Sequence, residues 1–317
     1  MQEANMKIVL LENLAVPEER LLTEKEVLSG RGHEFVWFER TDDLNKLQEE
    51  VRDADVIMLA NMPLPESVID AAPNLKYIDV AFTGVDHIPV RAAKHRGIQI
   101  SNASGYATES VAELVIAFMI ESLRKLPALE ARGKEGGTKA GLRGCLLKGK
   151  TVGIVGAGAI GTEVARLASA FGCRVLGYNR SKIGDPAFDA QLPLDDVLKE
   201  SDIVSVHVPL TQETKHLIGT KELGMMKRGA LLVNTARGSV VDEKALIEAL
   251  KNNQISACLD VYDKEPPLDK DNELLSLDHC ILTPHMGFDS VESMDKRANI
   301  VFDNLYSWLE GTLKNEI

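Results

Sequence analysis

The chain has 317 residues, enough for two domains of ordinary size, each with its own hydrophobic core. With 44% hydrophobic and 26% charged residues, it has the composition of a globular protein rather than a fibrous or disordered one. A formal net charge of -12 argues against general affinity for nucleic acid or for an anionic membrane surface.

Neither the N-terminal segment nor the spacing of the cysteines indicates a membrane protein or a metal site. The first residues, 1–5, are acidic, and the apolar run Ile8 to Leu11 is too short for a signal-peptide core or a membrane span. We therefore expect a cytoplasmic protein. The cysteines are scattered and form no close pair of the kind found in zinc sites or redox dithiols, so we expect reduced, mostly buried thiols and no metal. They are Cys145, Cys173, Cys258 and Cys280.

Apolar, β-branched runs alternate with amphipathic stretches along the whole chain, a pattern typical of parallel sheets wound with crossover helices. In the first hundred residues the pattern predicts one open sheet without a phosphate-binding loop, and helices between its strands, for example at Asp42 to Arg52. The strands are expected at Lys7 to Leu11, Glu34 to Phe38, Val56 to Leu59, Tyr77 to Val80 and Gln99 to Ser101.

A second set of strands follows an apolar helix predicted at Glu109 to Lys125 and a glycine-rich, charged segment, Arg132 to Gly144. We interpret the helix as the first element of a second domain and the segment after it as a surface connector. The strands of this set are expected at Thr151 to Val155, Arg174 to Tyr178, Ile203 to His207, Leu231 to Asn234, Ser256 to Asp260 and Cys280 to Leu282.

A glycine-rich turn follows the first strand of the second set, and a helix is predicted directly after it, at Thr162 to Phe171. Gly156 permits the tight turn, Gly158 lets the backbone approach a pyrophosphate, and Gly161 lets helix pack on strand. Free N–H groups at the start of the helix, near Ala159 and Ile160, suit the phosphates. Glycines also gather in ordinary turns, but the strand before and the helix after favour a dinucleotide fingerprint.

The fingerprint and its six strands favour a dinucleotide-binding sheet in the order 3-2-1-4-5-6. A last helix, roughly Ser290 to Glu310, is long enough to return to the first domain. The predicted fold class is therefore α/β with two doubly wound parallel-sheet domains. The expected boundaries are residues 1–103 and 291–317 for a substrate domain of flavodoxin-like type, and residues 104–290 for a Rossmann NAD(P)-binding domain.

The residue at the end of the second strand of this set is expected to bind the adenosine ribose, and its type indicates which cofactor is used. An acid is expected there for NAD, but the sequence has Asn179. A neutral Asn179 removes repulsion toward a 2′-phosphate, and Arg180, Ser181 and Lys182 can bind one. The sequence thus predicts NAD(P)H with a preference for NADPH. The alternative is that Arg180 and Lys182 are solvated loop cations and NAD is used.

The second half of the chain contains a guanidinium, a carboxylate and an imidazole in three separate motifs. They belong to Arg237, Glu265 and His285. Reduction of an anionic carbonyl compound needs a cation to hold it, a proton donor for its oxygen, and a carboxylate that keeps the donor protonated. Alone, each residue has a plain structural reading: an ion pair, an acid at a helix start beside Pro266, or a structural histidine. Together they favour a hydride-transfer centre.

Three motifs surround these residues: residues 234–238 (NTARG), Leu259 to Tyr262 leading to Glu265, and residues 283–287 (TPHMG). With the fingerprint, they give the chain a full-length resemblance to the D-isomer-specific 2-hydroxyacid dehydrogenases, which include glyoxylate/hydroxypyruvate reductases and D-lactate dehydrogenases. The resemblance implies that Arg237 holds the substrate carboxylate and carbonyl, that His285 is the general acid in reduction, and that Glu265 orients and stabilises the imidazolium.

The resemblance also assigns residues to substrate and cofactor. Thr83 and Gly84 would offer backbone N–H groups to the substrate carboxylate, with Phe82 shaping the pocket, and Tyr106 would either meet the substrate or pack at a hinge. Asp260 would lie near the nicotinamide carboxamide. Other implied cofactor-binding residues are Thr108, His207, Val208, Pro209, Thr214, Thr235, Ala236 and Gly287.

In this family the apolar helix and the connector make the dimer contact. The connector lacks a tryptophan common in related chains, so the mode of pairing is open. A homodimer is still expected, since Val115, Phe118 and Met119 would give the helix apolar surface to bury.

The leading hypothesis is an enzyme that uses NAD(P)H to reduce 2-keto acids such as glyoxylate, hydroxypyruvate or pyruvate to D-2-hydroxy acids. The alternative is a nucleotide-sensing binding protein or corepressor on the same scaffold. Formate dehydrogenases share the fingerprint but carry a glutamine where Pro284 stands, which disfavours them.

Overall fold

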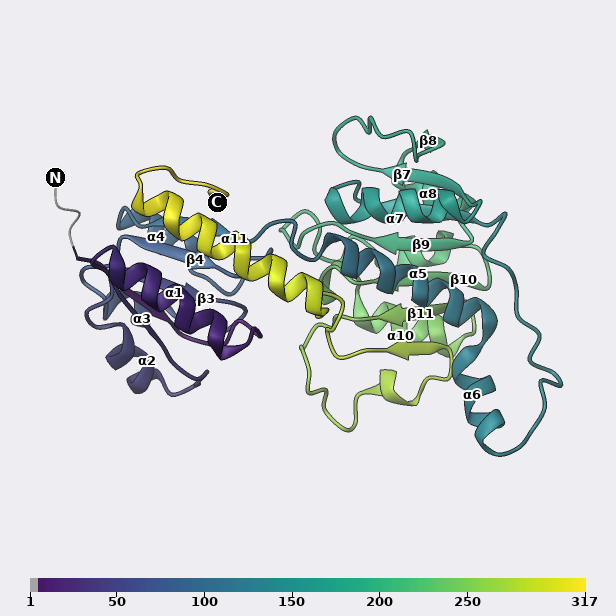
Figure 1. Ribbon diagram of the computed structural model, residues 1–317. Coiled ribbons are helices and arrows are strands. Elements are labelled where there is room, and N and C mark those ends of the chain that lie inside the picture. The colour runs from purple at the N-terminus through teal and green to yellow at the C-terminus, as the bar shows by residue number, and fades with distance from the viewer. Residues whose placement is uncertain (1–4) are drawn as a thin grey trace. The chain divides into compact units, whose positions relative to one another are not determined.

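The computed structural model describes residues 5–317, and these fall into two compact units (Figure 1). Unit 1 contains residues 5–107 together with Asp289–Ile317, and unit 2 is Thr108–Phe288. Residues 1–4, which belong to the acidic first residues and to the expected substrate domain, lie outside the described part. That one unit binds substrate and the other the cofactor stays a prediction.

Unit 1 is built on a five-stranded, wholly parallel sheet in the order β2-β1-β3-β4-β5, the flavodoxin-like order. Its strands are β1 (Lys7–Leu10), β2 (Glu34–Trp37), β3 (Val56–Leu59), β4 (Tyr77–Val80) and β5 (Gln99–Asn102). Its helices are α1 (Glu18–Gly30), α2 (Leu44–Val51), α3 (Glu66–Asp70), α4 (Val90–His95) and α11 (Val291–Leu309). The predicted strands are found within one residue at either end.

The central strands of this sheet are buried on both faces, since every residue of β3 and β4 is buried. Helices cover both faces of such sheets, so strands read as continuous apolar runs rather than alternating ones. α11 packs against β4, although it comes from the far end of the chain (Figure 1).

Unit 2 is built on a seven-stranded parallel sheet in the order β12-β11-β10-β9-β6-β7-β8. Its strands are β6 (Thr151–Val155), β7 (Arg174–Tyr178), β8 (Ala190–Gln191), β9 (Ile203–Val206), β10 (Ala230–Asn234), β11 (Ile255–Leu259) and β12 (Cys280–Leu282). Its helices are α5 (Thr108–Arg124), α6 (Leu126–Lys134), α7 (Ala159–Ala170), α8 (Leu194–Glu200), α9 (Thr220–Met225) and α10 (Glu243–Lys251), with 3-10 turns at Gly238–Val240 and Glu273–Ser276. The predicted fold class is confirmed.

The prediction of six strands in unit 2 is wrong by one. β8 is only two residues long and neither is fully buried, so it leaves no apolar run in the sequence. It pairs with β7 and takes the outer position that the order 3-2-1-4-5-6 gives to the third strand. β9, predicted as the third strand, therefore lies on the other side of β6.

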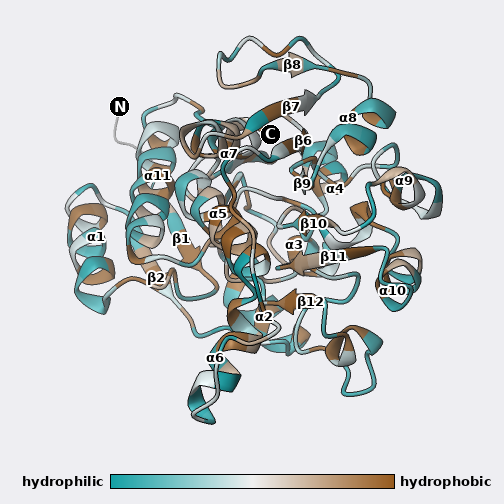
Figure 2. Cartoon of the chain, turned by 90° about the vertical axis from the view of Figure 1, so that its right-hand side faces the viewer, coloured by the Kyte–Doolittle hydropathy of each residue, from teal (hydrophilic) through white to brown (hydrophobic). Residues whose placement is uncertain are grey.

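Amphipathic helices cover the sheet of unit 2. In Figure 2, β11 and β12 are brown, whereas α10 mixes teal and brown along its length. Leu246, Ile247, Ala249 and Leu250 are the buried residues of α10, and they recur at the spacing that puts one face of a helix on the core.

The apolar side chains of the predicted helix that were expected to face a second copy are covered by the chain itself, and the homodimer stays a prediction. Val115, Phe118 and Met119 are buried in unit 2 itself, where α5 packs against α7 and β10. The predicted connector begins as α6, whose residues, all within the described range, are exposed or half-buried. An apolar helix face that the chain already covers cannot also supply a dimer surface.

No helix within residues 5–317 is long and apolar enough to cross a membrane. Across the same residues, the structure holds no group of three or more His, Cys, Asp or Glu side chains able to bind a metal ion. Cys173 and Cys258 are buried, Cys280 is half-buried and Cys145 is exposed.

One acid lies fully buried in the sheet of unit 1. Asp79, in β4, accepts a hydrogen bond from Nδ2 of Asn304 at 3.2 Å, while its second oxygen has no partner among the described residues. Burial raises the pKa of the Asp79 carboxyl well above its ordinary value. When folding raises the pKa of a carboxyl, the unfolded state loses its proton at a lower pH than the folded state. The free energy of unfolding therefore falls as the pH rises above the ordinary pKa of the group.

We therefore expect Asp79→Asn to raise the unfolding temperature at neutral pH, by an amount that shrinks as the pH falls toward about 4. Each unit of pKa elevation corresponds to about 1.4 kcal/mol. Thermal unfolding followed by circular dichroism from pH 4 to 8 measures this. A difference that stays constant over that range would contradict the assignment.

Candidate active site

Arg237, Glu265 and His285 each follow one of three neighbouring strands of unit 2, β10, β11 and β12. The carboxyl ends of parallel strands meet at one edge of a sheet, which is where such folds bind ligands. The sheet therefore brings the loops that carry these three residues to the same edge.

His285 and Glu265 are in direct contact. Nδ1 of His285 lies 2.8 Å from Oε2 of Glu265, and the two side chains are 23% and 47% exposed. The imidazole also meets the ring of Phe288 edge-on, with centroids 5.6 Å apart. His285 has φ = 55°, a left-handed conformation that is costly for a residue other than glycine, so its surroundings must hold it there.

Asp260 supplies much of that support. Asp260 is 1% exposed. Oδ1 accepts hydrogen bonds from the Thr283 hydroxyl at 2.5 Å and from the Met286 N–H at 2.9 Å, and Oδ2 accepts one from the Gly287 N–H at 2.8 Å. The carboxylate thus forms hydrogen bonds to residues on both sides of His285 and restricts the movement of its loop. The predicted role of Asp260 beside the nicotinamide remains a prediction.

Asn234 organises the loop of Arg237. Its Oδ1 accepts from the Ala236 N–H at 3.1 Å and its Nδ2 donates to the Arg237 carbonyl at 3.0 Å. Nη1 of Arg237 also donates to the Ala236 carbonyl at 2.7 Å. Asn234 closes the strand β10 and belongs to the motif around Arg237, but sequence reasoning gave it no role.

Gly238 joins the Arg237 loop to the Glu265 loop. A Cβ atom at Gly238 would lie 1.9 Å from the carbonyl carbon of Tyr262, so only glycine fits there without a backbone shift. The hydroxyl of Tyr262 in turn donates to the Thr283 carbonyl at 2.7 Å, which links the second loop to the third. The three loops are therefore packed against one another and bonded together.

The glycine-rich turn has the geometry that a dinucleotide requires. Gly156 has φ = 103°, and a Cβ atom on it would lie 2.8 Å from the His207 carbonyl. A Cβ atom on Gly161 would lie 2.0 Å from the Gly156 oxygen. At Gly158, the N-cap of α7, a Cβ atom would meet nothing within 4 Å, so the backbone is open to a ligand.

Thr235 gives a second sign of a ligand at this edge of unit 2. Its hydroxyl oxygen is buried and has no hydrogen-bond partner among residues 5–317. Buried hydroxyls without a partner are uncommon in folded proteins, so a group of this kind is suited to bind a ligand. Both observations fit a nicotinamide dinucleotide.

At the predicted ribose end, Asn179 accepts from the Ala157 N–H at 3.4 Å and donates to the Ser181 hydroxyl at 2.9 Å. Gln191, in the unpredicted strand β8, donates to the carbonyls of Asn179 and Ser181 at 3.1 and 2.9 Å. Arg180 is exposed. The loop is thus shaped by β8, which sequence reasoning missed, and Asn179 is turned toward the glycine-rich turn.

The segment after β9 lies along the glycine-rich turn. Nε2 of His207 is 2.8 Å from the Ser205 hydroxyl, and burial lowers the pKa of His207 to about 3, so the imidazole is neutral at physiological pH. Val208 packs against Gly156. The hydroxyl of Thr214 donates to the Pro209 carbonyl at 2.6 Å and keeps the segment folded back on itself.

The start of α5 lies beside the His285 loop. Thr108 is the first residue of α5, and the Ser110 hydroxyl donates to the Gly287 carbonyl at 2.8 Å. Thr108 and Gly287, both predicted to bind cofactor, thus belong to neighbouring segments of unit 2.

The predicted substrate residues of unit 1 follow β4 and β5. The N–H groups of Thr83 and Gly84 have no acceptor among the described residues. Phe82 is 7% and Tyr106 1% exposed, with ring centroids 6.0 Å apart, and the Arg297 guanidinium lies 5.7 Å from the Tyr106 ring. This enclosure favours the packing role for Tyr106, and its contact with substrate stays a prediction.

The close fit of Gly238 leads to a test. Gly238→Ala should lower the unfolding free energy by roughly 1–3 kcal/mol and reduce any activity, because the new methyl group meets backbone that cannot rotate away. Gly224→Ala, in α9, is the control, since its Cβ meets nothing within 4 Å. Chemical denaturation and cofactor oxidation measure both effects; a Gly238→Ala protein with unchanged stability would refute the packing argument.

The chain resembles known proteins over most of its length. The family model described as "D-isomer specific 2-hydroxyacid dehydrogenase, NAD binding domain" matches residues 116–287. A hydroxypyruvate reductase of Thermotoga maritima is 40% identical, with 86% of this chain and 89% of that protein aligned. A glyoxylate reductase structure from Paecilomyes thermophila has a TM-score of 0.89 at 32% identity, covering 99% of this chain and 98% of that one.

A D-3-phosphoglycerate dehydrogenase of Methanocaldococcus jannaschii is 39% identical over 86% of this chain. This chain spans about half of that relative, 53% of its length. The family model covers more than half of the chain, and the hydroxypyruvate reductase aligns with it over most of both sequences. The chain therefore belongs to the D-isomer specific 2-hydroxyacid dehydrogenase family.

Proposed function

We propose that this protein uses a nicotinamide cofactor to interconvert small 2-keto acids and D-2-hydroxy acids. Membership of an oxidoreductase family with an NAD-binding domain supports the reaction class. The observation that carries the proposal is the 2.8 Å contact between His285 and Glu265, on loops bonded to that of Arg237. Relatives named glyoxylate reductase and hydroxypyruvate reductase support glyoxylate and hydroxypyruvate as substrates, with pyruvate as a third candidate.

In the proposed reaction His285 is the acid and base. Glu265 accepts a hydrogen bond from Nδ1–H of His285, which orients the ring and stabilises the imidazolium. Nε2 then delivers its proton to the ketone oxygen during reduction and takes it back during oxidation. The bound nicotinamide supplies or receives the hydride. Asp260 keeps the His285 loop in place throughout.

Arg237 binds the anion. A guanidinium holds a carboxylate and the neighbouring carbonyl oxygen through parallel charge-assisted hydrogen bonds, which fixes the ketone carbon for hydride attack. We separately assign to the N–H groups of Thr83 and Gly84, in unit 1, the binding of a substrate carboxylate.

For the cofactor we propose NAD(P)H with a preference for NADPH. The backbone at Gly158 would receive the pyrophosphate, with Gly156 and Gly161 allowing the close packing of the turn. Thr235 would donate a hydrogen bond from its unpartnered hydroxyl to the cofactor. Asn179 carries no charge that would repel a 2′-phosphate, and Arg180 is exposed beside it.

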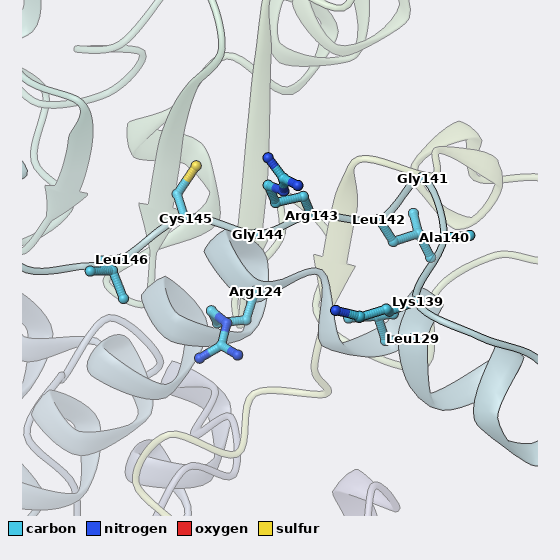
Figure 3. A pocket seen from close by; sticks show the side chains of 10 residues that line it. All are labelled: Arg124, Leu129, Lys139, Ala140, Gly141, Leu142, Arg143, Gly144, Cys145 and Leu146. Carbon is cyan, nitrogen blue, oxygen red and sulfur yellow. The ribbon is translucent and has the colours of Figure 1, made fainter.

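We further propose that the protein is a homodimer that pairs through α6 and the connector loop. This region forms a hollow of about 820 Å³ on the surface of unit 2, and Arg124, Lys139 and Arg143 are among the residues lining it (Figure 3). Leu126 and Leu146 are 45% and 71% exposed there. A second copy would cover apolar side chains that the chain leaves in solvent.

The proposed chemistry predicts large, specific losses of activity. Arg237→Ala and His285→Ala should each lower kcat/KM for 2-keto acids by roughly 10²–10⁴-fold, because each removes a group that acts in the transition state. His279→Ala, at an exposed histidine of unit 2, is the control. Initial rates of cofactor oxidation with glyoxylate, hydroxypyruvate and pyruvate test this. A folded protein that binds cofactor but turns over no keto acid would instead be a nucleotide-sensing binding protein.

The cofactor preference has a separate test. Initial rates should favour NADPH over NADH, and Arg180→Ala should raise KM for NADPH about ten-fold with little effect on NADH, since only NADPH carries the 2′-phosphate. Arg228→Ala removes an exposed arginine elsewhere in unit 2 and serves as the control. A strong preference of the unaltered protein for NADH would overturn the role given to Asn179 and Arg180.

A further inference from the structure

We infer that Asn102 is a positioning residue for the substrate: its side chain holds the Thr83 carbonyl so that the N–H of Gly84 points away from it, toward the substrate carboxylate. The inference rests on the proposed function, because it explains how the loop that we assign to the carboxylate is kept in a binding conformation.

Asn102 connects the loops that follow β4 and β5. It is the last residue of β5 and is 8% exposed. Its Nδ2 donates to the Thr83 carbonyl at 2.7 Å, and its Oδ1 accepts from the Ser104 N–H at 3.2 Å. One side chain therefore satisfies a backbone group in each of the two loops.

The bond to Thr83 decides the direction of the next amide. In a trans peptide the C=O of one residue and the N–H of the next lie in one plane and point in opposite directions. Since the Thr83 carbonyl faces Asn102, the Gly84 N–H faces the other way. Neither it nor the Thr83 N–H has an acceptor within residues 5–317, so both can bind an anion. Glycine is conformationally permissive, so without this bond little prevents the peptide from rotating.

The backbone of Asn102 is itself clamped. Its carbonyl accepts from Nδ2 of Asn304 at 3.1 Å, and its N–H donates to the Asn315 carbonyl at 3.1 Å. Nδ2 of Asn315 donates to Oδ1 of Asn304 at 2.7 Å. Asn304 lies in α11 and is fully buried, which anchors the network in the core of unit 1.

The C-terminal residues that hold Asn102 pair with the open edge of the sheet. β5 is an edge strand, so half of its backbone groups lack a strand partner. Residues 315–317 supply one: Ser101 forms an antiparallel bridge with Glu316, and the Ile317 N–H donates to the Ile100 carbonyl at 3.1 Å. Both backbone groups of Asn102 are thereby hydrogen-bonded within unit 1, and its side chain is held where it reaches Thr83.

The test is Asn102→Ala, compared with Asn252→Ala. Asn252 is exposed in unit 2 and its Nδ2 donates to a backbone carbonyl, that of Glu248, at 2.9 Å, so the control loses the same kind of bond. We expect Asn102→Ala to raise KM for the keto acid roughly ten-fold, the worth of a hydrogen bond to a charged group, with kcat changed less than three-fold and KM for the cofactor unchanged. A purely structural role would instead lower kcat, through loss of folded protein, and leave KM for the keto acid unchanged.

Oxalate gives a readout that does not depend on turnover. Added to the protein with bound cofactor, it should shift the amide resonance of Gly84 in a ¹H–¹⁵N spectrum, and this shift should be lost in Asn102→Ala and kept in Asn252→Ala. Asn102→Asp, which retains the acceptor for Ser104 but cannot donate to Thr83 while ionised, should lose it too and serves if Asn102→Ala fails to fold.

The possible outcomes separate the two proposals. Turnover by the unaltered protein, with the same KM and the same oxalate response in Asn102→Ala, would overturn the role of Asn102 alone. Absence of turnover with every keto acid, and no response of Gly84 to oxalate, would overturn the proposed function and this inference together.

Discussion

The parallel pairing of β10, β11 and β12 is the constraint on which the candidate site depends. Because the three strands run in the same direction and lie side by side, the loops that follow them leave the sheet at one edge. Packing then decides how closely the loops approach. Gly238 lets one loop touch the backbone of the next, and the Asp260 carboxylate holds the third in the strained conformation of His285. The chemistry proposed for His285 therefore relies on a residue that itself transfers no proton.

The same edge of unit 2 explains how the cofactor would be received. The glycine-rich turn approaches the loop after β9 so closely that Gly156 admits no side chain, yet the backbone at Gly158 is open. The buried, unpartnered hydroxyl of Thr235 lies directly after β10, in the motif that carries Arg237. In the proposed function, cofactor binding and chemistry would thus use one motif, with Thr235 two residues before Arg237, so substitutions intended to change cofactor preference are safest at the ribose loop, away from Thr235.

Unit 1 has a comparable arrangement in the loop to which we assign the substrate carboxylate. The N–H groups of Thr83 and Gly84 face no acceptor among the described residues, while the carbonyl between them is taken by Asn102. Asn102 is held by Asn304 and Asn315, and Asn304 also bonds the buried Asp79. A polar network of this kind is costly unless every member is satisfied, and the unpartnered oxygen of Asp79 is its weak point.

The amino-acid sequence by itself determined the strands with long apolar runs, the glycine-rich turn and the chemical identities of Arg237, Glu265 and His285, because these signals are local: each depends on residues within a few positions of one another. Only the tertiary structure decided what depends on distant segments. β8 is too short to leave a pattern, Val115, Phe118 and Met119 are covered by the chain's own α7 and β10, and the need for glycine at position 238 arises from Tyr262. Asp260 and Asn102 acquire their supporting roles in the same way, since a side chain's hydrogen-bond partners are set by the folding of segments that the local sequence does not contain.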